Sequence, residues 1–244
     1  MSVSIASPSK TSISYGCTVS RPTKSSKRSV PDLPRRLQAF YAASFAHFGP
    51  LEWWPGETHF EICVGAILTQ NTAWTNVEKA IANLKRERML TVRGMESAGR
   101  ERLAEAIRPA GYYNQKSEKL LNFCRHIRAA HGGSLSRLLA QPLPALRAEL
   151  LALKGVGPET ADSMILYAAA QPIFVVDAYT RRIFSRMGLV AADVGYDELQ
   201  DFFHRHVPPD TEHYGEFHAQ IVYVGKEFCR KAKPRCEACP VRLT

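Results

Sequence analysis

Residues 154–162 read KGVGPETAD and lie between two segments whose apolar residues recur at helical spacing. Gly155 and Gly157 permit backbone angles and close approaches that a side chain would prevent. Pro158 suits the first position of a helix, because no amide donor is needed there. The stretch therefore predicts two helices joined by a tight glycine turn.

Such a turn could bind an anion. Successive backbone amides at the turn and at the start of the next helix form a nest for negative charge. On a chain with a formal net charge of +9, a DNA phosphate is the obvious anion. A turn that only reverses the chain fits these residues equally well. Gly155, Val156 and Gly157 are therefore candidate DNA-binding residues whose role depends on the rest of the chain.

Helical periodicity continues along most of the chain. We expect helices over 33–48, 60–68, 74–84, 102–108, 114–130, 135–139, 143–153, 158–170, 178–187, 196–206 and 214–228. Residues 171–176 are short, β-branched and apolar, so they could be extended. There is no internal repeat and no strand–helix alternation. The predicted fold class is all-α.

A wider pattern surrounds the turn. LKGVGPETAD (153–162), followed by VVDAY (175–179), resembles the helix–hairpin–helix DNA glycosylases of the endonuclease III superfamily. Asp177 lies 18 residues after Glu159, which is the spacing that family shows between its two active-site positions. The resemblance runs from about Leu33 to the C-terminus. It implies a monomer that acts on double-stranded DNA containing a damaged base.

The same resemblance suggests how the chain is divided. We expect one six-helix subdomain over 53–171, which includes the hairpin. A second helical subdomain would combine 32–52 with 172–244. Residues 1–31 carry five basic and no acidic residues and are rich in Ser and Thr, so we expect a disordered basic tail. A transit peptide is compatible with that composition, but we favour a plain tail or a misplaced start codon.

Asp177 is the candidate catalytic residue. Cleavage of the bond between base and sugar makes the sugar cation-like, and a carboxylate can stabilise that charge and align water. Capping of the following helix is the alternative role. In the bifunctional branch the position of Glu159 is a lysine that attacks the sugar. Glutamate cannot do this, so we predict a monofunctional enzyme that leaves an abasic site. Favourable charge at a helix start is the other interpretation of Glu159.

All three tryptophans, Trp53, Trp54 and Trp74, lie within 22 residues. Aromatic faces can grip a flipped base and attract the positive ring of an N-alkylated purine. Ordinary core packing is the alternative. The pattern WWPGETHFE…LTQNTAW…YYNQK is similar to the 3-methyladenine glycosylase branch of the superfamily. That resemblance makes the tryptophans and Glu159 candidate walls of a base pocket.

Two further positions follow from the resemblance. Gln70 matches the family residue that fills the gap left by the flipped base, although a polar residue at a helix end is the simpler reading. The branch that removes mismatched adenine carries a catalytic glutamate where this chain has about Ala66. That branch also has a large extra C-terminal domain, which this sequence does not contain. We therefore discount adenine-mismatch repair.

Cys229, Cys236 and Cys239 follow a C-x6-C-x2-C pattern. In the superfamily a fourth cysteine follows after five residues, and the set binds a structural [4Fe–4S] cluster. Here the fourth would fall at position 245, one past the end. Zinc is the competing metal, because thiolates suit both. Basic residues that could touch phosphate, or simply be solvated, are Lys226, Arg230, Lys231, Lys233 and Arg235.

The sequence thus predicts a monofunctional DNA glycosylase, for an alkylated purine such as 3-methyladenine. An endonuclease III-type glycosylase/AP lyase for oxidised pyrimidines is the alternative, and Glu159 argues against it. A non-catalytic helix–hairpin–helix DNA-binding protein is a third option, and Asp177 argues against that. No apolar run is long enough for a membrane span. The cysteine pattern favours a reducing compartment, and we expect a cytoplasmic, nucleoid-associated bacterial enzyme.

Overall fold

The computed structural model describes residues 33–51 and 53–242. The tail predicted over 1–31 lies outside the described residues. Eleven α-helices occur in this part of the chain: α1 (Leu33–Phe48), α2 (His59–Leu68), α3 (Trp74–Arg86), α4 (Val92–Ala106), α5 (Tyr113–His131), α6 (Leu135–Leu139), α7 (Leu143–Ala152), α8 (Pro158–Ser163), α9 (Ala178–Arg186), α10 (Tyr196–His206) and α11 (Thr211–Glu227). Three short turns accompany them: η1 (Arg108–Ala110), the π-helical η2 (Met164–Ala168) and η3 (Cys236–Ala238). These residues contain no β-strand, so the all-α prediction is confirmed.

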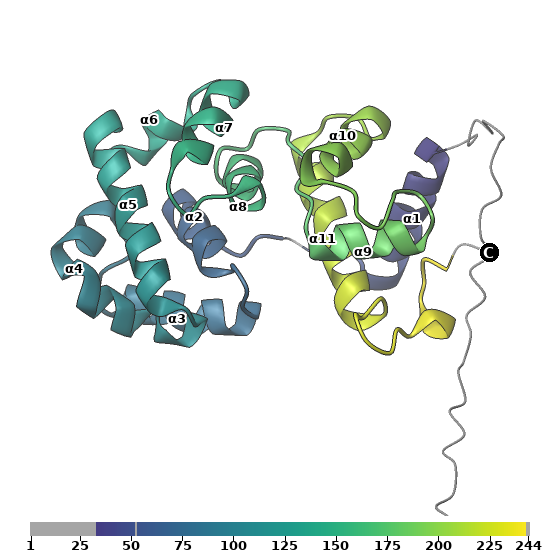
Figure 1. Cartoon of the computed structure of the whole chain (residues 1–244), viewed down its shortest axis with the longest axis horizontal. Helices are drawn as coiled ribbons and strands as arrows, with labels where there is room; N and C mark the ends of the chain where they lie inside the picture. The colour runs from purple at the N-terminus through teal and green to yellow at the C-terminus, as the bar shows by residue number, and fades with distance from the viewer. Residues whose placement is uncertain (1–32, 52, 243–244) are drawn as a thin grey trace, which may run out of the picture. The chain divides into compact units, whose positions relative to one another are not determined.

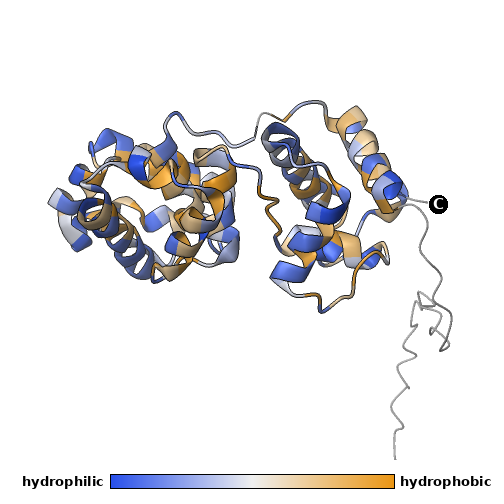
Figure 2. Cartoon of the chain, turned by 90° about the horizontal axis from the view of Figure 1, so that it is seen from above, coloured by the Kyte–Doolittle hydropathy of each residue, from blue (hydrophilic) through white to orange (hydrophobic). Residues whose placement is uncertain are grey.

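The helices form two groups (Figure 1). Helices α2 to α8 make one group, and α1 joins α9, α10, α11 and the cysteine-containing loop in the other. Hydrophobic stretches of neighbouring helices face one another within each group (Figure 2). The arrangement agrees with two helical subdomains, while the bounds proposed for them remain a prediction. Within the described residues, no helix combines the length and apolar character that crossing a membrane requires.

Two helices differ from the sequence prediction. Helix α4 begins ten residues earlier than expected, at Val92, and its helical geometry is interrupted at Gly99. The first part of α4 packs against α5. Met95 is fully buried there, and its sulfur lies 3.8 Å from the sulfur of Cys124. The helix predicted over 158–170 is instead α8 followed by the π-helical turn η2. Both differences arise from packing that local periodicity does not encode.

A buried carboxylate connects the hairpin to the second group of helices. Asp162 of α8 is inaccessible and pairs with Arg147 of α7 at 2.8 Å. It also accepts hydrogen bonds from the hydroxyl of Tyr196 at 2.9 Å and the amide of Gln200 at 2.7 Å. Gln200 additionally donates to the carbonyl of Phe174 at 2.7 Å. This network fixes the extended segment that leads from α8 to Asp177.

A buried lysine supports the C-terminal end of α2. Lys116 of α5 is 2% exposed, and its Nζ donates to the carbonyls of Leu68 and Ala110, each at 2.8 Å. Burial, followed by the nearby positive charge of Lys119, lowers the pKa of Lys116 to about 8. The lysine therefore caps the C-terminal end of α2, just before Gln70.

Candidate active site

Asp177 caps helix α9, as the sequence predicts. Its Oδ1 accepts hydrogen bonds from the amide of Thr180 at 2.7 Å and from the hydroxyl of Thr180 at 2.8 Å. The Thr180 hydroxyl in turn accepts from the amide of Asp177 at 3.3 Å, which completes a capping box. The cap uses Oδ1, so Oδ2 remains available for a second role.

Two residues that the sequence analysis did not select complete this arrangement. The Nε2 of His218 lies 3.7 Å from Asp177 Oδ2, which is an electrostatic contact rather than a hydrogen bond. The Nδ1 of His218 lies 2.7 Å from the hydroxyl of Tyr167. Burial raises the pKa of Tyr167 well above its usual value, so the hydroxyl remains a donor. With Nδ1 directed at the Tyr167 hydroxyl, Nε2 of His218 faces Asp177.

These contacts keep Asp177 ionised. Burial raises the pKa of Asp177, but the interaction with His218 and the hydrogen bonds from Thr180 lower it by more. The pKa therefore lies below its usual value. A carboxylate that is almost enclosed, with a side chain 11% exposed, thus keeps its negative charge at neutral pH.

Glu159 lies in the first turn of α8 and lines the same cavities as Asp177. Its side chain is accessible to solvent, but the surrounding walls of the cleft reduce its hydration. That desolvation and the negative charge of Asp177 raise the pKa of Glu159 to about 7, against the opposing effects of His218 and Arg181. The two carboxyl groups therefore differ in protonation near neutral pH.

Two connected cavities meet at these carboxyl groups. The larger, of about 1160 Å³, is lined by the hairpin and by the basic residues Lys119, Lys226 and Arg230. The smaller, of about 460 Å³, is walled by all three tryptophans together with His218 and Val222. Residues common to both cavities are Thr69, Thr72, Glu159, Ser163, Asp177, Tyr179 and Lys226. The structure therefore brings the predicted pocket residues together around Asp177.

The tryptophans pack mainly against one another. The rings of Trp54 and Trp74 meet edge to face, with centroids 5.1 Å apart, and Trp54 lies 5.0 Å from Tyr167. Trp53 lies 6.1 Å from Trp74, and Lys226 Nζ lies 5.4 Å from the centroid of Trp53. The Nε1 atom of Trp53 is buried without a hydrogen-bond partner in the described structure. The tryptophan cluster thus forms one wall of the smaller cavity, and the Nε1 donor of Trp53 is free to bind an acceptor there.

The two glycines of the hairpin serve different needs. Gly155 has a φ of 96°, and a Cβ there would lie 2.5 Å from Cγ of Lys119. Gly157 has an ordinary φ of −99°, and a Cβ there would meet no atom within 4 Å. The fold therefore requires glycine at 155 but not at 157. Val156 is 8% exposed, so its side chain anchors the turn from within.

Gln70 is attached to this hairpin. Its Nε2 donates to the carbonyl of Gly155 at 3.1 Å and to the hydroxyl of Thr160 at 2.9 Å. Its Oε1 accepts from Lys119. Gln70 thus lines the larger cavity while linking the end of α2 to the hairpin, a connection that the sequence did not indicate.

With this geometry established, comparison with known proteins gives the family. Residues 64–209 match the profile of HhH-GPD superfamily base excision DNA repair proteins. This chain belongs to the HhH-GPD superfamily. The resemblance to the endonuclease III superfamily that the sequence motifs suggested is confirmed.

Three similar proteins illustrate the relationship. The Methanocaldococcus jannaschii protein MJ1434, named as a candidate DNA repair glycosylase, is 46% identical over 208 residues, covering 84% of this chain and 94% of the relative. Helicobacter pylori 3-methyladenine DNA glycosylase (MagIII), solved bound to 1,N6-ethenoadenine, has a TM-score of 0.70 and 30% identity, covering 80% of this chain and 97% of that one. An endonuclease III–DNA complex has a TM-score of 0.74 at 22% identity, covering 85% and 92%, and shows the fold alone.

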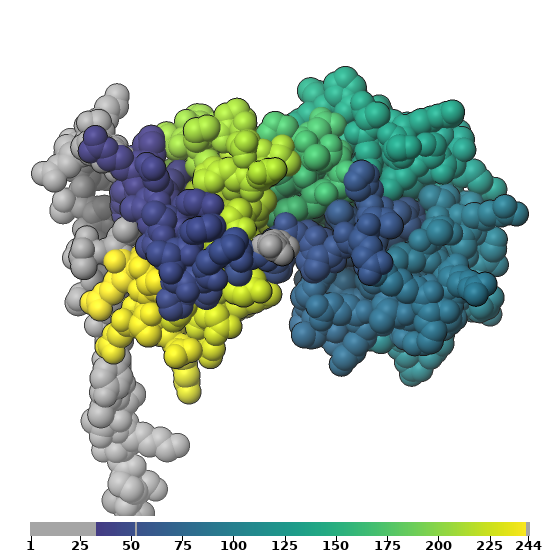
Figure 3. Space-filling view, turned by 180° about the vertical axis from the view of Figure 1, so that it is seen from behind, coloured from purple at the N-terminus to yellow at the C-terminus, as the bar shows by residue number. Residues whose placement is uncertain are grey.

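The cysteine loop of this HhH-GPD protein gathers its thiols around one cavity. Cys229, Cys236 and Cys239 all line a space of about 340 Å³. Burial first, and then the proximity of the other two cysteines, raise the pKa of Cys239. Arg186 places Nη1 3.4 Å from the Cys229 sulfur. Beside the loop lies α1 (Figure 3), where His47 contacts the ring of Phe228 at 5.4 Å.

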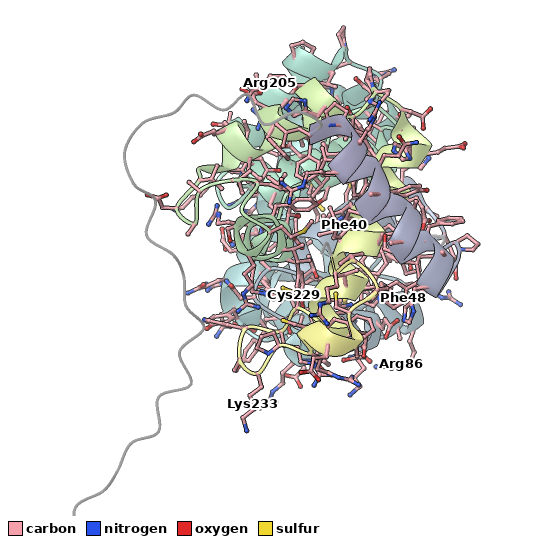
Figure 4. All side chains as sticks on the ribbon, turned by 90° about the vertical axis from the view of Figure 1, so that its right-hand side faces the viewer. Phe40, Phe48, Arg86, Arg205, Cys229 and Lys233 are labelled. Carbon is pink, nitrogen blue, oxygen red and sulfur yellow. The ribbon has the colours of Figure 1, made fainter. Side chains whose placement is uncertain are left out.

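The basic residues in and near the cysteine loop lie in two different places. Lys226, Arg230 and Lys231 line the larger cavity near Asp177. Lys233 projects from the tip of the loop, away from Cys229 (Figure 4). Arg186 holds the loop by donating to the carbonyl of Arg230 at 2.8 Å and to that of Lys231 at 3.1 Å. Part of the predicted basic cluster therefore faces the cleft.

Proposed function

We propose that this protein is a monofunctional DNA glycosylase that removes an alkylated purine, such as 3-methyladenine, and leaves an abasic site. The observation that carries the proposal is the position of Asp177. Its ionised carboxylate lies where a tryptophan-walled cavity joins a cleft lined by the hairpin and by basic side chains. That arrangement suits a flipped base in the smaller cavity and a DNA backbone along the larger one.

The chemistry follows from the charge of the base. An N3-alkylated adenine carries positive charge, so the bond between C1′ and N9 can break with its electron pair moving to the base, which leaves neutral. The sugar becomes an oxocarbenium ion, which the Asp177 carboxylate stabilises. Water then bonds to C1′ and gives up a proton, which Asp177 Oδ2 would accept in this proposal. The products are the free base and an abasic sugar.

The substrate class rests on the tryptophan wall. Trp53, Trp54 and Trp74 offer π-faces to a cationic base, and such a base needs little acid catalysis to leave. The 30% identity to an H. pylori enzyme named for 3-methyladenine supports the same choice. We further propose that Glu159, with its pKa raised to about 7, forms part of this wall and supplies negative charge near the base at higher pH.

DNA is held, in this proposal, by the hairpin and its neighbours. The backbone of Gly155, Val156 and Gly157 would receive a phosphate, and the open space beside Gly157 leaves room for that approach. Lys226, Arg230 and Lys231 would neutralise further phosphates. Gln70 would contact the duplex from the same edge of the cleft.

The absence of lyase activity is a separate part of the proposal. The resemblance of the sequence motifs implies that Glu159 takes the position of the lysine in the bifunctional branch, and a carboxylate cannot form a Schiff base. Lys226 lines both cavities and is the amine best placed to substitute. Borohydride trapping on damaged DNA should give no covalent adduct. An adduct that disappears in Lys226→Met would contradict monofunctionality.

We also propose that Cys229, Cys236 and Cys239 ligate a [4Fe–4S] cluster. The three thiols share one cavity and Arg186 offers compensating charge, which fits thiolate ligation. Such a cluster takes four ligands, and the C-x6-C-x2-C pattern supplies three of them. When bound, the cluster would cross-link the loop that carries Arg230 and Lys231. An iron–sulfur absorption band in anaerobically purified protein tests this, and a colourless, iron-free protein would exclude it.

Base release from a panel of damaged duplexes tests the central proposal. Duplexes containing alkylated, oxidised or deaminated bases are incubated with the protein, and the freed base and strand nicking are measured separately. We expect release of alkylated purines without nicking. Release confined to oxidised pyrimidines, accompanied by nicking, would instead establish the glycosylase/AP lyase activity.

A further inference from the structure

A second cluster of ligand-type side chains lies where the end of α5 meets α7. His126 and His131 come from α5, and Glu149 comes from α7. The Nε2 atoms of the two histidines lie 2.5 Å and 2.6 Å from the same oxygen, Oε1 of Glu149. None of the three lines either cavity of the candidate active site. The cluster is therefore separate from the proposed glycosylase chemistry.

The surroundings of this cluster hold the carboxylate in place. Gln141 Nε2 donates to the other oxygen of Glu149, Oε2, at 2.6 Å. The side chains of His126, His131 and Glu149 are 26%, 13% and 22% exposed, so solvent reaches the group. An oriented carboxylate therefore faces two imidazoles at a site that solvent can enter.

We propose that His126, His131 and Glu149 bind a divalent transition-metal ion, best matched by Zn²⁺. The ligand atoms of the three residues all lie within 4.8 Å of one another. Two ligands on a tetrahedral zinc ion lie about 3.3 Å apart, as follows from Zn–N distances of about 2.0–2.1 Å. Small side-chain rotations would therefore admit the ion, with water as its fourth ligand.

The donor set matches zinc chemistry. Two imidazole nitrogens and one carboxylate oxygen are common zinc ligands, and neutral imidazole binds through the nitrogen that does not carry the proton. A histidine that binds the ion through Nε2 carries its ring proton on Nδ1, and any proton on Nε2 is released to water. The hydrogen bond from Gln141 would persist as an outer contact that orients Glu149.

The position of the cluster gives the ion a structural role. Helix α7 is the first helix of the hairpin motif, and α5 also carries Lys119, which lies against Gly155. A zinc ion at this cluster would add a second link between α5 and the hairpin motif, separate from the contact of Lys119 with Gly155. Metal binding should therefore stabilise the hairpin helices while leaving the active-site side chains in place.

The test uses the full-length protein after treatment with a chelator. Co²⁺ is titrated as a spectroscopic substitute for Zn²⁺, because a nitrogen–oxygen site gives d–d absorption without the thiolate charge-transfer band expected from the cysteine loop. Glu149→Gln and His131→Gln should each reduce the affinity of the histidine–glutamate site for Co²⁺ by at least about tenfold. The matched controls Glu105→Gln and His59→Gln, at exposed positions, should retain it.

A second measurement separates metal binding from folding. The rise in melting temperature on adding Zn²⁺ is compared with each protein's own metal-free value. Wild type and both controls should show a rise attributable to this site, and Glu149→Gln and His131→Gln should lack it. The proposal would be overturned if wild-type protein bound Co²⁺ without giving d–d absorption from a site that lacks sulfur ligands. It would also be overturned if Glu149→Gln and His131→Gln bound the ion as tightly as wild type.

Discussion

Substituting alanine for Gly155 should destabilise the protein, whereas the same substitution at Gly157 should not. In Gly155→Ala, the φ of 96° forces an alanine into a conformation that costs L-residues roughly 1–2 kcal/mol. The new Cβ would also lie 2.5 Å from Cγ of Lys119, so that side chain must move and give up its hydrogen bond to Gln70. We expect a total loss of about 2–3 kcal/mol in the free energy of unfolding.

Gly157→Ala is the matched comparison. Its backbone is extended and its surroundings are open, so alanine should leave stability unchanged or raise it by up to about 1 kcal/mol. The added methyl group would nevertheless occupy the space through which a phosphate approaches. Gly157→Ala should therefore bind DNA several-fold more weakly while folding normally.

Urea denaturation of wild type and both variants measures the first effect, and equilibrium binding to a DNA duplex measures the second. At about 2–4 °C per kcal/mol for a chain of this size, Gly155→Ala should melt roughly 4–12 °C lower. The double variant Gly155→Ala/Lys119→Ala should recover the part of the lost unfolding free energy that comes from overlap between the new Cβ and the Lys119 side chain. Equal stability of Gly155→Ala and wild type, or a greater loss in Gly157→Ala, would refute the reasoning.

Three further predictions concern buried or desolvated charges. Asp162→Ala leaves Arg147 without its principal partner and should cost about 3–5 kcal/mol in urea denaturation; a loss below about 1 kcal/mol would show that the network is not required. The pKa of Glu159 is raised from 4.5 to about 7, so wild type should lose stability relative to Glu159→Gln as pH rises from about 4.5 to 7, with no further change above. A constant difference between pH 5 and pH 8 would contradict this. The pKa of Lys116 is lowered from 10.5 to about 8, so its contribution should make wild type more stable as pH rises from about 8 to 10.5. Lys116→Met should lack that rise, and an identical pH dependence in both proteins would argue against the buried charge.

Local signals predicted much of the fold and part of the site. Helical periodicity indicated most helices to within a few residues, and the glycine turn and the cap at Asp177 were visible because both depend on neighbouring residues. The first half of α4 was missed because its helical state depends on the packing of Met95 against α5. The requirement for glycine at 155, unlike 157, also depends on a distant side chain, Lys119.

Contacts between distant helices were beyond sequence reasoning. His218 and Tyr167 are 51 residues apart and belong to ordinary helical patterns, so nothing local connects them to Asp177. The cluster of His126, His131 and Glu149 forms only because α6 returns the chain so that α7 lies against α5. Such groups become visible only when the packing of the helices is known.

The most direct test of the central claim is single-turnover release of 3-methyladenine by Asp177→Asn. Asparagine preserves the helix cap, so the variant should fold with nearly the stability of wild type. The loss of negative charge beside the forming sugar cation should lower the release rate by about 100-fold or more. Asp193→Asn, which changes an exposed carboxylate that lines neither cavity of the candidate active site, should release the base at the wild-type rate. Undiminished release by folded Asp177→Asn would contradict the assignment of Asp177 as the catalytic carboxylate.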